Sequence, residues 1–243
     1  MKEFTVVIPL IPLHDREMKR IFSTLAAEAH LVREVVICRS ESNLGKSQAI
    51  ESKFQRWARR SGLNVPVTCS LTAEKAYDGT NRNRGWLIAK SHYVAFIDAD
   101  DDYRSNRLTS LLSVFNRTDC DAILHNYEDD EALWPAVKQH ELSEPSEPIQ
   151  ACLIGSEGPL DFSVPISDQD GRVLQIHHAH ASVKTEVAGT AMYTGIFPGA
   201  DTELCKKLIL AGLNVAYMTE KLSNWNRRRS FRYKLRLLKR RFL

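Results

Sequence analysis

Cysteine pairs and long hydrophobic runs are both missing from this chain of 243 residues. Its cysteines are five, an odd number, and no two of them form a CxxC pair. This argues against a disulfide framework and against a zinc site made of cysteines, so we interpret them as reduced core residues of a cytosolic protein. No stretch approaches the roughly 18 consecutive apolar residues that a transmembrane helix needs.

The amino terminus also lacks the features of a signal peptide. It reads MKEFTVVIPLIPLH, in which two prolines interrupt the apolar stretch and Glu3 falls within the region that should be basic. No small-residue cleavage site follows. We therefore predict that this segment forms the first β-strand of a folded domain.

Acidic residues are absent from the carboxyl-terminal segment 227–243, which carries nine lysines and arginines. The other residues have 24 basic and 30 acidic side chains, a net charge of −6. In the segment, four apolar side chains recur at helical spacing, which predicts a basic amphipathic helix: Phe231, Leu235, Leu238 and Phe242. Such a helix suits an anionic membrane surface. Packing on the body or on a partner is the alternative, and no nucleic-acid partner is expected because the body is acidic.

Apolar, β-branched runs alternate with helix-like segments along most of the chain. The predicted strands are 4–10, 34–38, 65–71, 91–97, 121–125, 172–178 and 213–218, and the predicted helices are 14–30, 45–61, 81–91, 105–115 and 201–212. This alternation predicts an α/β domain over residues 1–226 with a mostly parallel central sheet flanked by helices. Within it, the acidic, proline-bearing stretch 127–150 is predicted to be a loop or insertion.

Four aspartates gather in FIDADDDY, residues 96–103, directly after a predicted buried strand. Asp102 or Ser105 could cap the following helix. A calcium loop is a second interpretation, although the EF-hand glycine and distal glutamate are missing. The third is a divalent ion shared with a phosphorylated ligand, for which Asp98 and Asp100 supply two carboxylates from one short turn.

These aspartates belong to a longer pattern that resembles the family 2 glycosyltransferases, which have the GT-A fold. The opening strand FTVVIPL carries the resemblance together with the block from Arg82 and Asn83 to the aspartates. The segment GADTELCKKLILAGLNVAYMTEKL completes it. These pieces span residues 4–225 in the family's order.

The resemblance implies a site and a reaction. It implies an inverting, metal-dependent transfer of a single sugar from a nucleoside-diphosphate donor, a UDP-sugar first of all, to a glycan or lipid-linked acceptor. Mn²⁺ or Mg²⁺ is the implied cofactor. Asp201 matches the family's catalytic base and Asp100, with Asp98, its metal ligands. The implied contacts to the nucleotide sugar are Pro9, Ser40, Glu41, Arg82, Asn83, Asp98 and Asp101.

The sequence departs from the family pattern at two places. After the second strand it reads CRSESN, residues 38–43, where the family has an aspartate-rich turn, so Ser40 or Glu41 would have to take that role. Ala200 precedes Asp201 where glutamate is usual. The stretch 224–230 resembles the motif of processive members only loosely, which favours transfer of single sugars.

Two other functions stay open at this point. A nucleotidyltransferase acting on a sugar phosphate is disfavoured because no glycine-rich phosphate loop follows the first strand. The altered turn 38–43 also leaves open a catalytically silent protein that binds a membrane or a partner.

Three histidines lie close together in the sequence: His177, His178 and His180. They lack a nearby acidic or cysteine partner, so we favour an exposed strand or the acceptor side of the cleft over a zinc site.

The membrane hypothesis predicts that the full chain floats with anionic liposomes in a density gradient, whereas a shortened chain ending at Asn226 stays at the bottom. The reason is that each basic residue near an anionic surface contributes about 1 kcal/mol. Neutral liposomes are the control. Equal flotation of the two chains would remove the membrane hypothesis.

Overall fold

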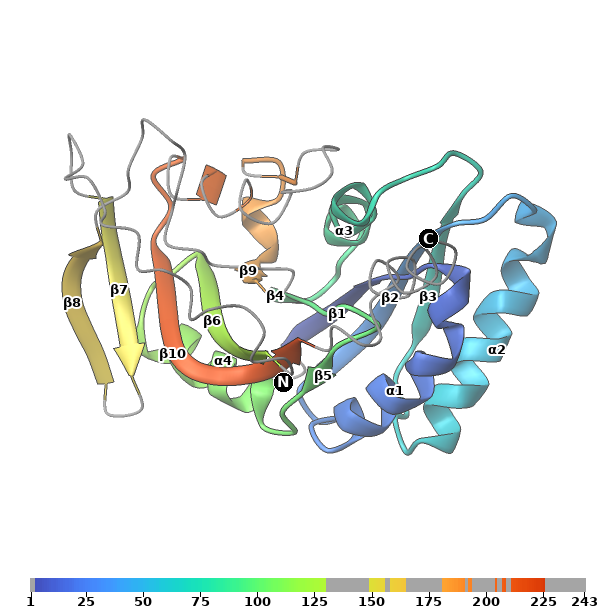
Figure 1. Cartoon of the computed structure of the whole chain (residues 1–243), viewed down its shortest axis with the longest axis horizontal. Coiled ribbons are helices and arrows are strands. Elements are labelled where there is room, and N and C mark those ends of the chain that lie inside the picture. Colours follow the sequence, from blue (N-terminus) through green and yellow to red (C-terminus); the bar gives the residue numbers. More distant parts are fainter. Residues whose placement is uncertain are drawn as a thin grey trace, which may run out of the picture.

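The computed structural model describes residues 3–129, 149–155, 158–164, 181–190, 192–193, 204, 207–208 and 211–225. Ten strands occur in these residues: β1 (Phe4–Pro9), β2 (Val32–Ser40), β3 (Val67–Thr72), β4 (Tyr93–Phe96), β5 (Asp102–Tyr103), β6 (Ala122–Asp129), β7 (Ile149–Gly155), β8 (Gly158–Val164), β9 (Ser182–Lys184) and β10 (Val215–Trp225). They form one sheet in the order β3-β2-β1-β4-β9-β6-β10-β7-β8, with β5 paired to β10 (Figure 1).

The sheet is mostly parallel, as predicted from the alternation of strands and helices. β1 lies parallel to both β2 and β4, β2 to β3, and β10 to both β6 and β7. The antiparallel members are the short strands β5 and β9 and the strand β8. β9 pairs with β4 and β6 and so joins the two parallel parts.

Helices cover both faces of the sheet (Figure 1). They are α1 (Met18–Ala26), preceded by a 3₁₀ turn at Pro12–Glu17, then α2 (Ser47–Arg60), α3 (Asp78–Leu87) and α4 (Arg107–Arg117). Apolar side chains of α1, α2 and α4 pack against one face, in a core that includes Phe4, Val6 and Ile8 of β1. Val7 points to the other face, where it packs in a second core with Trp86 of α3. Because successive side chains of a strand point to opposite faces of the sheet, β1 contributes residues to both cores.

Most strand and helix predictions are confirmed, with shifted ends. The strands predicted at 4–10, 34–38, 65–71, 91–97, 121–125 and 213–218 correspond to β1, β2, β3, β4, β6 and β10. The predicted loop 127–150 was wrong at both ends, because β6 continues to Asp129 and β7 begins at Ile149. The predicted strand 172–178 and tail helix 227–243 lie outside the described residues, as does most of 201–212.

Cys38, Cys69 and Cys120 have free thiols, in line with the prediction of reduced cysteines. Cys38 and Cys120 are buried and Cys69 is partly buried. Burial raises the pKa of the Cys38 thiol to about 12, so the reactive thiolate form is suppressed at neutral pH.

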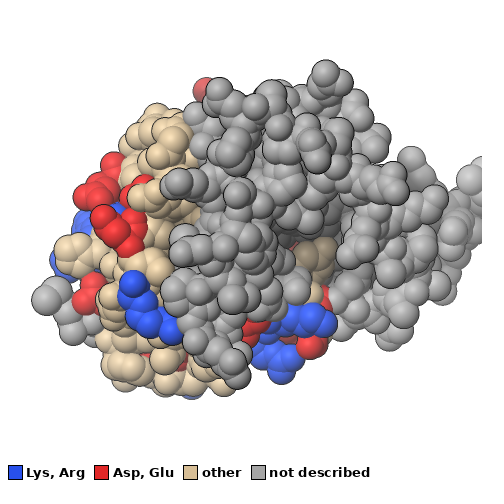
Figure 2. Space-filling view, turned by 90° about the vertical axis from the view of Figure 1, so that its left-hand side faces the viewer, with Lys and Arg blue, Asp and Glu red and all other residues tan. Residues whose placement is uncertain are grey.

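Within the described part of the chain, no helix combines the length and the apolar character needed to cross a bilayer. Acidic and basic side chains are interspersed on the described part of the face in Figure 2.

Capping of α4 differs from the prediction. Asp102 lies in β5, and Asn106 at the N-cap position makes no side-chain capping bond, so the predicted caps Asp102 and Ser105 were wrong. The buried carboxylate of Glu28 takes this role from the end of α1. It accepts hydrogen bonds from the Leu108 and Thr109 amides at 2.9 and 2.7 Å. A cap from 80 residues away leaves no local signal in the sequence.

Gly85 lets α3 approach β1 closely, and this contact predicts that a larger residue at position 85 destabilises the fold. An added Cβ would lie 2.3 Å from Cγ1 of Val7. Glycine to alanine normally stabilises a helix interior by about 1 kcal/mol. Here we expect Gly85→Ala to lower the free energy of unfolding by about 1–3 kcal/mol, because the core is overpacked. Urea denaturation measures the change.

The matched test of that cause is the same substitution in a Val7→Ala background. Removing the two Val7 methyl groups should make the cost of Gly85→Ala smaller, because directly contacting residues are not additive. An unchanged cost would show that the Val7 contact is not its origin.

Candidate active site

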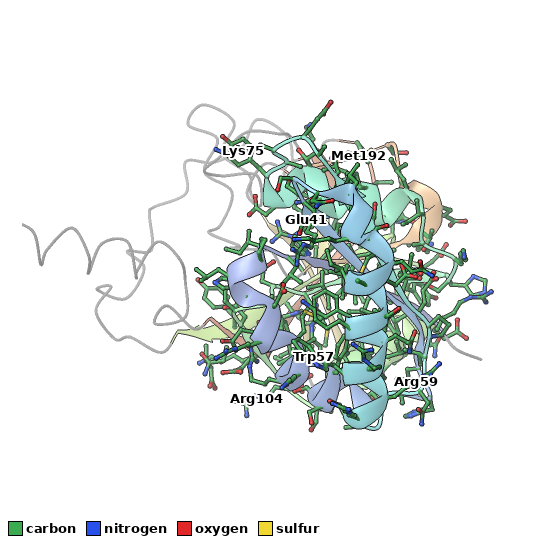
Figure 3. All side chains as sticks on the ribbon, turned by 90° about the vertical axis from the view of Figure 1, so that its right-hand side faces the viewer. Glu41, Trp57, Arg59, Lys75, Arg104 and Met192 are labelled. Carbon is green, nitrogen blue, oxygen red and sulfur yellow. The ribbon has the colours of Figure 1, made fainter. Side chains whose placement is uncertain are left out.

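The predicted site residues that the structure describes lie around the carboxyl ends of β1, β2 and β4. β1 ends at Pro9, β2 ends at Ser40, and the aspartates follow β4. Pro9 pairs with Cys38 and Val7 with Phe96, so these three strand ends are neighbours. In the view of Figure 3 this edge is the upper one, with Glu41 near it and Arg59 of α2 at the opposite end. Parallel α/β sheets bind ligands outside such an edge.

Arg82 of α3 forms an ion pair with Asp98 at this edge. Its Nη2 lies 2.5 Å from Oδ1 of Asp98 and its Nη1 lies 3.7 Å from Oδ2 of Asp78. The Arg82 side chain is 1% exposed, whereas that of Asp98 is 22% exposed. The guanidinium is therefore a fixed cation beneath a carboxylate that faces solvent. The two residues, 16 positions apart in the sequence, are in contact in the folded chain.

The backbone around the aspartates is also held by the partly buried Tyr103 and the buried Arg107. Tyr103 Oη accepts a hydrogen bond from the Asp98 amide at 2.5 Å and donates to the Asp98 carbonyl at 3.1 Å. Arg107 donates to the Phe96 carbonyl at 3.1 Å, and its guanidinium lies 5.2 Å from the centre of the Tyr103 ring. The turn therefore has little freedom to move when a ligand arrives.

Arg20 of α1 holds the same turn from another side. It donates to the Ala99 carbonyl at 3.1 Å and to the Asp101 carbonyl at 2.5 Å, and it forms an ion pair with Asp102. Asp102 is thus occupied within the protein. Sequence reasoning missed Arg20, Tyr103 and Arg107, because nothing in their spacing marks them as partners of the aspartates.

Asp100 is the aspartate that could take an external cation. It is half-buried and makes no ion pair with any of the described residues. Burial and then the neighbouring Asp101 carboxylate raise the pKa of Asp100, while the nearby His14 acts against that rise. A divalent ion would relieve both causes.

His14 is a second residue that the sequence did not indicate. It follows β1 closely, is 7% exposed, and its Nε2 atom has no hydrogen-bond partner within the described part of the chain. His14 belongs to no recognisable sequence motif, so nothing in the sequence indicates that it lies near the aspartates. Among the described residues, no three His, Cys, Asp or Glu side chains are grouped so as to hold a metal ion.

The end of β2 carries a charge network instead of the family's aspartate-rich turn. The Arg39 guanidinium, 4% exposed, pairs with Asp15 at 2.8 Å and with Glu41, and Lys53 reaches Asp15 at 2.6 Å. The hydrogen bond from Arg39 lowers the pKa of the Glu41 carboxyl. Ser40 Oγ accepts from the Ala76 amide at 2.7 Å. Ser40 and Glu41 are therefore engaged within the protein, and their predicted contact with the donor stays a prediction.

Asn83, the neighbour of Arg82, is also engaged within the protein. Its amide group donates to the Tyr193 carbonyl at 2.8 Å and accepts from the Tyr193 amide at 2.9 Å. Its predicted contact with the nucleotide stays a prediction. The predicted base Asp201 and the histidines at 177, 178 and 180 lie outside the described residues.

The mostly parallel α/β sheet with its flanking helices is the fold of the GT-A glycosyltransferases. The model of the protein family described as "Glycosyl transferase family 2" matches residues 11–162, which is more than half of the chain. The chain therefore belongs to family 2 of the glycosyl transferases, and the family predicted from the sequence is confirmed. No curated protein matches the chain at a significant level.

Solved structures agree with this fold. S. aureus TarS 1-349 has a TM-score of 0.62 and 14% identity over 93% of this chain and 60% of that one. Glucosyl-3-phosphoglycerate synthase from M. tuberculosis has a TM-score of 0.57 and 14% identity over 93% of this chain and 73% of that one. The chain thus spans about 60% of the TarS fragment's length. At a sequence identity of 14%, the similarity to these structures establishes a shared fold.

The environment of Asp100 predicts a trade-off between stability and ligand binding. Since its pKa is raised in the folded state, the folded protein favours the neutral carboxyl and loses stability as the pH rises through that pKa. Asp100→Asn is neutral at every pH. We expect it to raise the free energy of unfolding of the ligand-free protein at pH 7, with the gain vanishing below the unfolded-state pKa of about 3.9.

The matched control is Asp119→Asn. The Asp119 side chain is 97% exposed and pairs with Lys184, so its replacement should give no such gain. Urea denaturation across the pH range measures both variants. A destabilised Asp100→Asn at pH 7 would contradict the electrostatic account.

Proposed function

We propose that this enzyme transfers a single sugar from a nucleoside-diphosphate sugar, a UDP-sugar first of all, to a hydroxyl group of a glycan or lipid-linked acceptor, with inversion. One observation carries the proposal. Asp100, a half-buried carboxylate without an ion pair among the described residues, lies beside the fixed Arg82–Asp98 pair at the ligand-binding edge of the sheet.

Complexes of structural neighbours support the choice of donor. TarS 1-349 is solved with UDP-GlcNAc and with UDP. The M. tuberculosis synthase is solved with Mn²⁺, UDP and phosphoglyceric acid. For the present chain we propose the same ligand classes, a uridine diphosphate and Mn²⁺ or Mg²⁺. Their identity here rests on the shared fold and on the residues at the edge.

The residues present fit a divalent ion together with a diphosphate. Asp100 and Asp98 would hold the ion, since hard cations such as Mg²⁺ take carboxylate oxygens and keep the remaining positions for water and phosphate. When bound, it would stabilise the negative charge of the leaving diphosphate as a Lewis acid. We propose that Arg82, which is paired with Asp98 in the ligand-free protein, donates to phosphate oxygens of the bound donor. Pro9, Ser40, Glu41, Asn83 and Asp101 complete the proposed donor site.

Asp201 is the proposed general base. Its carboxylate would take the proton of the acceptor hydroxyl while that oxygen attacks the anomeric carbon. The bond between this carbon and the diphosphate oxygen breaks, and its electron pair leaves with the diphosphate. A single displacement of this kind inverts the anomeric centre. Arg20, Tyr103 and the buried Arg107 hold the aspartate turn through hydrogen bonds, so we expect little reorganisation of the site during the reaction.

We further propose that the enzyme works in the cytoplasm, with residues 227–243 on the anionic inner face of a membrane. Nine basic residues without an acidic one support this proposal, because the body is itself acidic and would be repelled by such a surface. A membrane location would bring the site to lipid-linked acceptors. The flotation experiment given above for this segment tests it.

The donor site is tested by thermal unfolding with UDP, with GDP, with UTP and with each of them plus Mn²⁺. A ligand that binds the folded state at 100 times its Kd adds about 2.7 kcal/mol of stability. We expect UDP with Mn²⁺ to raise the Tm most and Asp100→Ala to lose the part that depends on Mn²⁺. Asp119→Ala, the exposed control, should behave like the wild type.

The outcomes separate the alternatives. No shift with any nucleoside diphosphate, or an identical shift in Asp100→Ala, would refute the donor site and favour a catalytically silent protein. A shift with a nucleoside triphosphate but not with the diphosphate would favour nucleotidyl transfer. Release of UDP from a UDP-sugar in the presence of an acceptor would establish the transfer itself.

A further inference from the structure

Arg82 contacts an aromatic ring as well as the carboxylates of Asp98 and Asp78. Its central carbon lies 5.1 Å from the centre of the Tyr193 ring, which does not belong to the aspartate turn. That distance is within the range in which an arginine is attracted to the negative face of an aromatic ring. Both Arg82 and Tyr193 are buried, so the attraction is little weakened by water.

Tyr193 is itself fixed at both its backbone and its ring. Asn83 bonds the amide and the carbonyl of Tyr193, at 2.9 and 2.8 Å. Lys207 donates to the Met192 carbonyl at 3.2 Å. The Tyr193 ring meets the Phe96 ring edge-on at 5.4 Å, and Phe96 is the last residue of β4 before the aspartate turn.

We propose that Tyr193 is a positioning residue of the donor site, because its ring holds the Arg82 guanidinium on Asp98 while Asn83 holds the Tyr193 backbone. A long arginine side chain loses much rotamer freedom when it is fixed, and a ring in contact with its guanidinium disfavours the alternative positions. Asn83 thereby acts on Asp98 through Tyr193 and Arg82. The consequence for the donor rests on the function proposed above.

A purely structural role for Tyr193 makes a different prediction. Ring packing against Phe96 would stabilise the fold whatever residue occupied position 82. A positioning role requires that the effect of Tyr193 on ligand binding depends on Arg82. The two roles are therefore separated by the coupling between these residues and not by the loss of stability alone.

The first experiment measures the Kd of UDP in the presence of Mn²⁺ by titration calorimetry, with the full chain. Tyr193→Leu should weaken binding about 3- to 30-fold, the range that corresponds to losing a buried cation–π contact. Tyr193→Phe keeps the ring face and should stay within about twofold of the wild type. In an Arg82→Gln background, Tyr193→Leu should cause no further loss.

The matched control is Tyr93→Leu. Tyr93 opens β4 at the end away from the aspartates and stacks on Phe115 at 4.0 Å. The same change of side chain there should lower the Tm but leave the Kd of UDP unchanged. If Tyr193→Leu weakens binding equally in the wild-type and Arg82→Gln backgrounds, the positioning role is refuted.

A second measurement needs no ligand and keeps the test separate from that of the function. The aromatic ring over Arg82 shifts the NMR signal of the Arg82 Nε–H group through its ring current. Tyr193→Leu should move this signal, whereas Tyr193→Phe and Tyr93→Leu should leave it in place. If wild-type protein binds no UDP, the proposed function fails and this signal alone decides the inference. An unmoved signal in Tyr193→Leu would overturn it.

Discussion

The ion pair between Arg82 and Asp98 is the interaction on which the rest of the site depends. Four aspartates within five positions repel one another, by about 4 kcal/mol for two charges 4 Å apart at the effective dielectric of a protein surface. Basic side chains of the protein itself offset much of this repulsion. Arg82 pairs with Asp98, and Arg20 pairs with Asp102 and binds the carbonyls of the turn. Asp100 is left half-buried with a raised pKa, as a carboxylate that an external cation would stabilise.

The arginines around this turn come from three different helices. Arg20 lies on α1, Arg82 on α3 and Arg107 at the start of α4. The packing of these helices on the sheet therefore also sets the positions of the charges. Removing Asp98 would be costly, because the Arg82 guanidinium is buried and water cannot readily replace its partner. If the donor binds as proposed, these contacts serve both stability and ligand binding, whereas at Asp100 the two requirements oppose each other.

The end of β2 shows how far the family pattern extends into this chain. A strand at 34–38 was predicted from the sequence, and the resemblance implied that the turn after it contacts the nucleotide. Because the family's aspartates are missing from that turn, Ser40 or Glu41 was expected to take their role. In the structure, Arg39, Asp15, Glu41 and Lys53 form a charge-balanced network at this end. The sequence does not show that Glu41 is bound to Arg39 and that Ser40 is bound to Ala76, because these contacts depend on how the following loops return to the sheet.

The sequence by itself determined the family, the α/β class, six of the strands and the location of the aspartates. These follow from local patterns: alternating apolar residues, helical spacing and a motif read along one segment. Only the tertiary structure decided which charges meet. Glu28 caps α4 from 80 residues away, and Asn83 binds Tyr193 from 110 residues away. Such pairs form because two buried elements happen to pack side by side, and a buried polar group must take whichever partner that packing brings within reach.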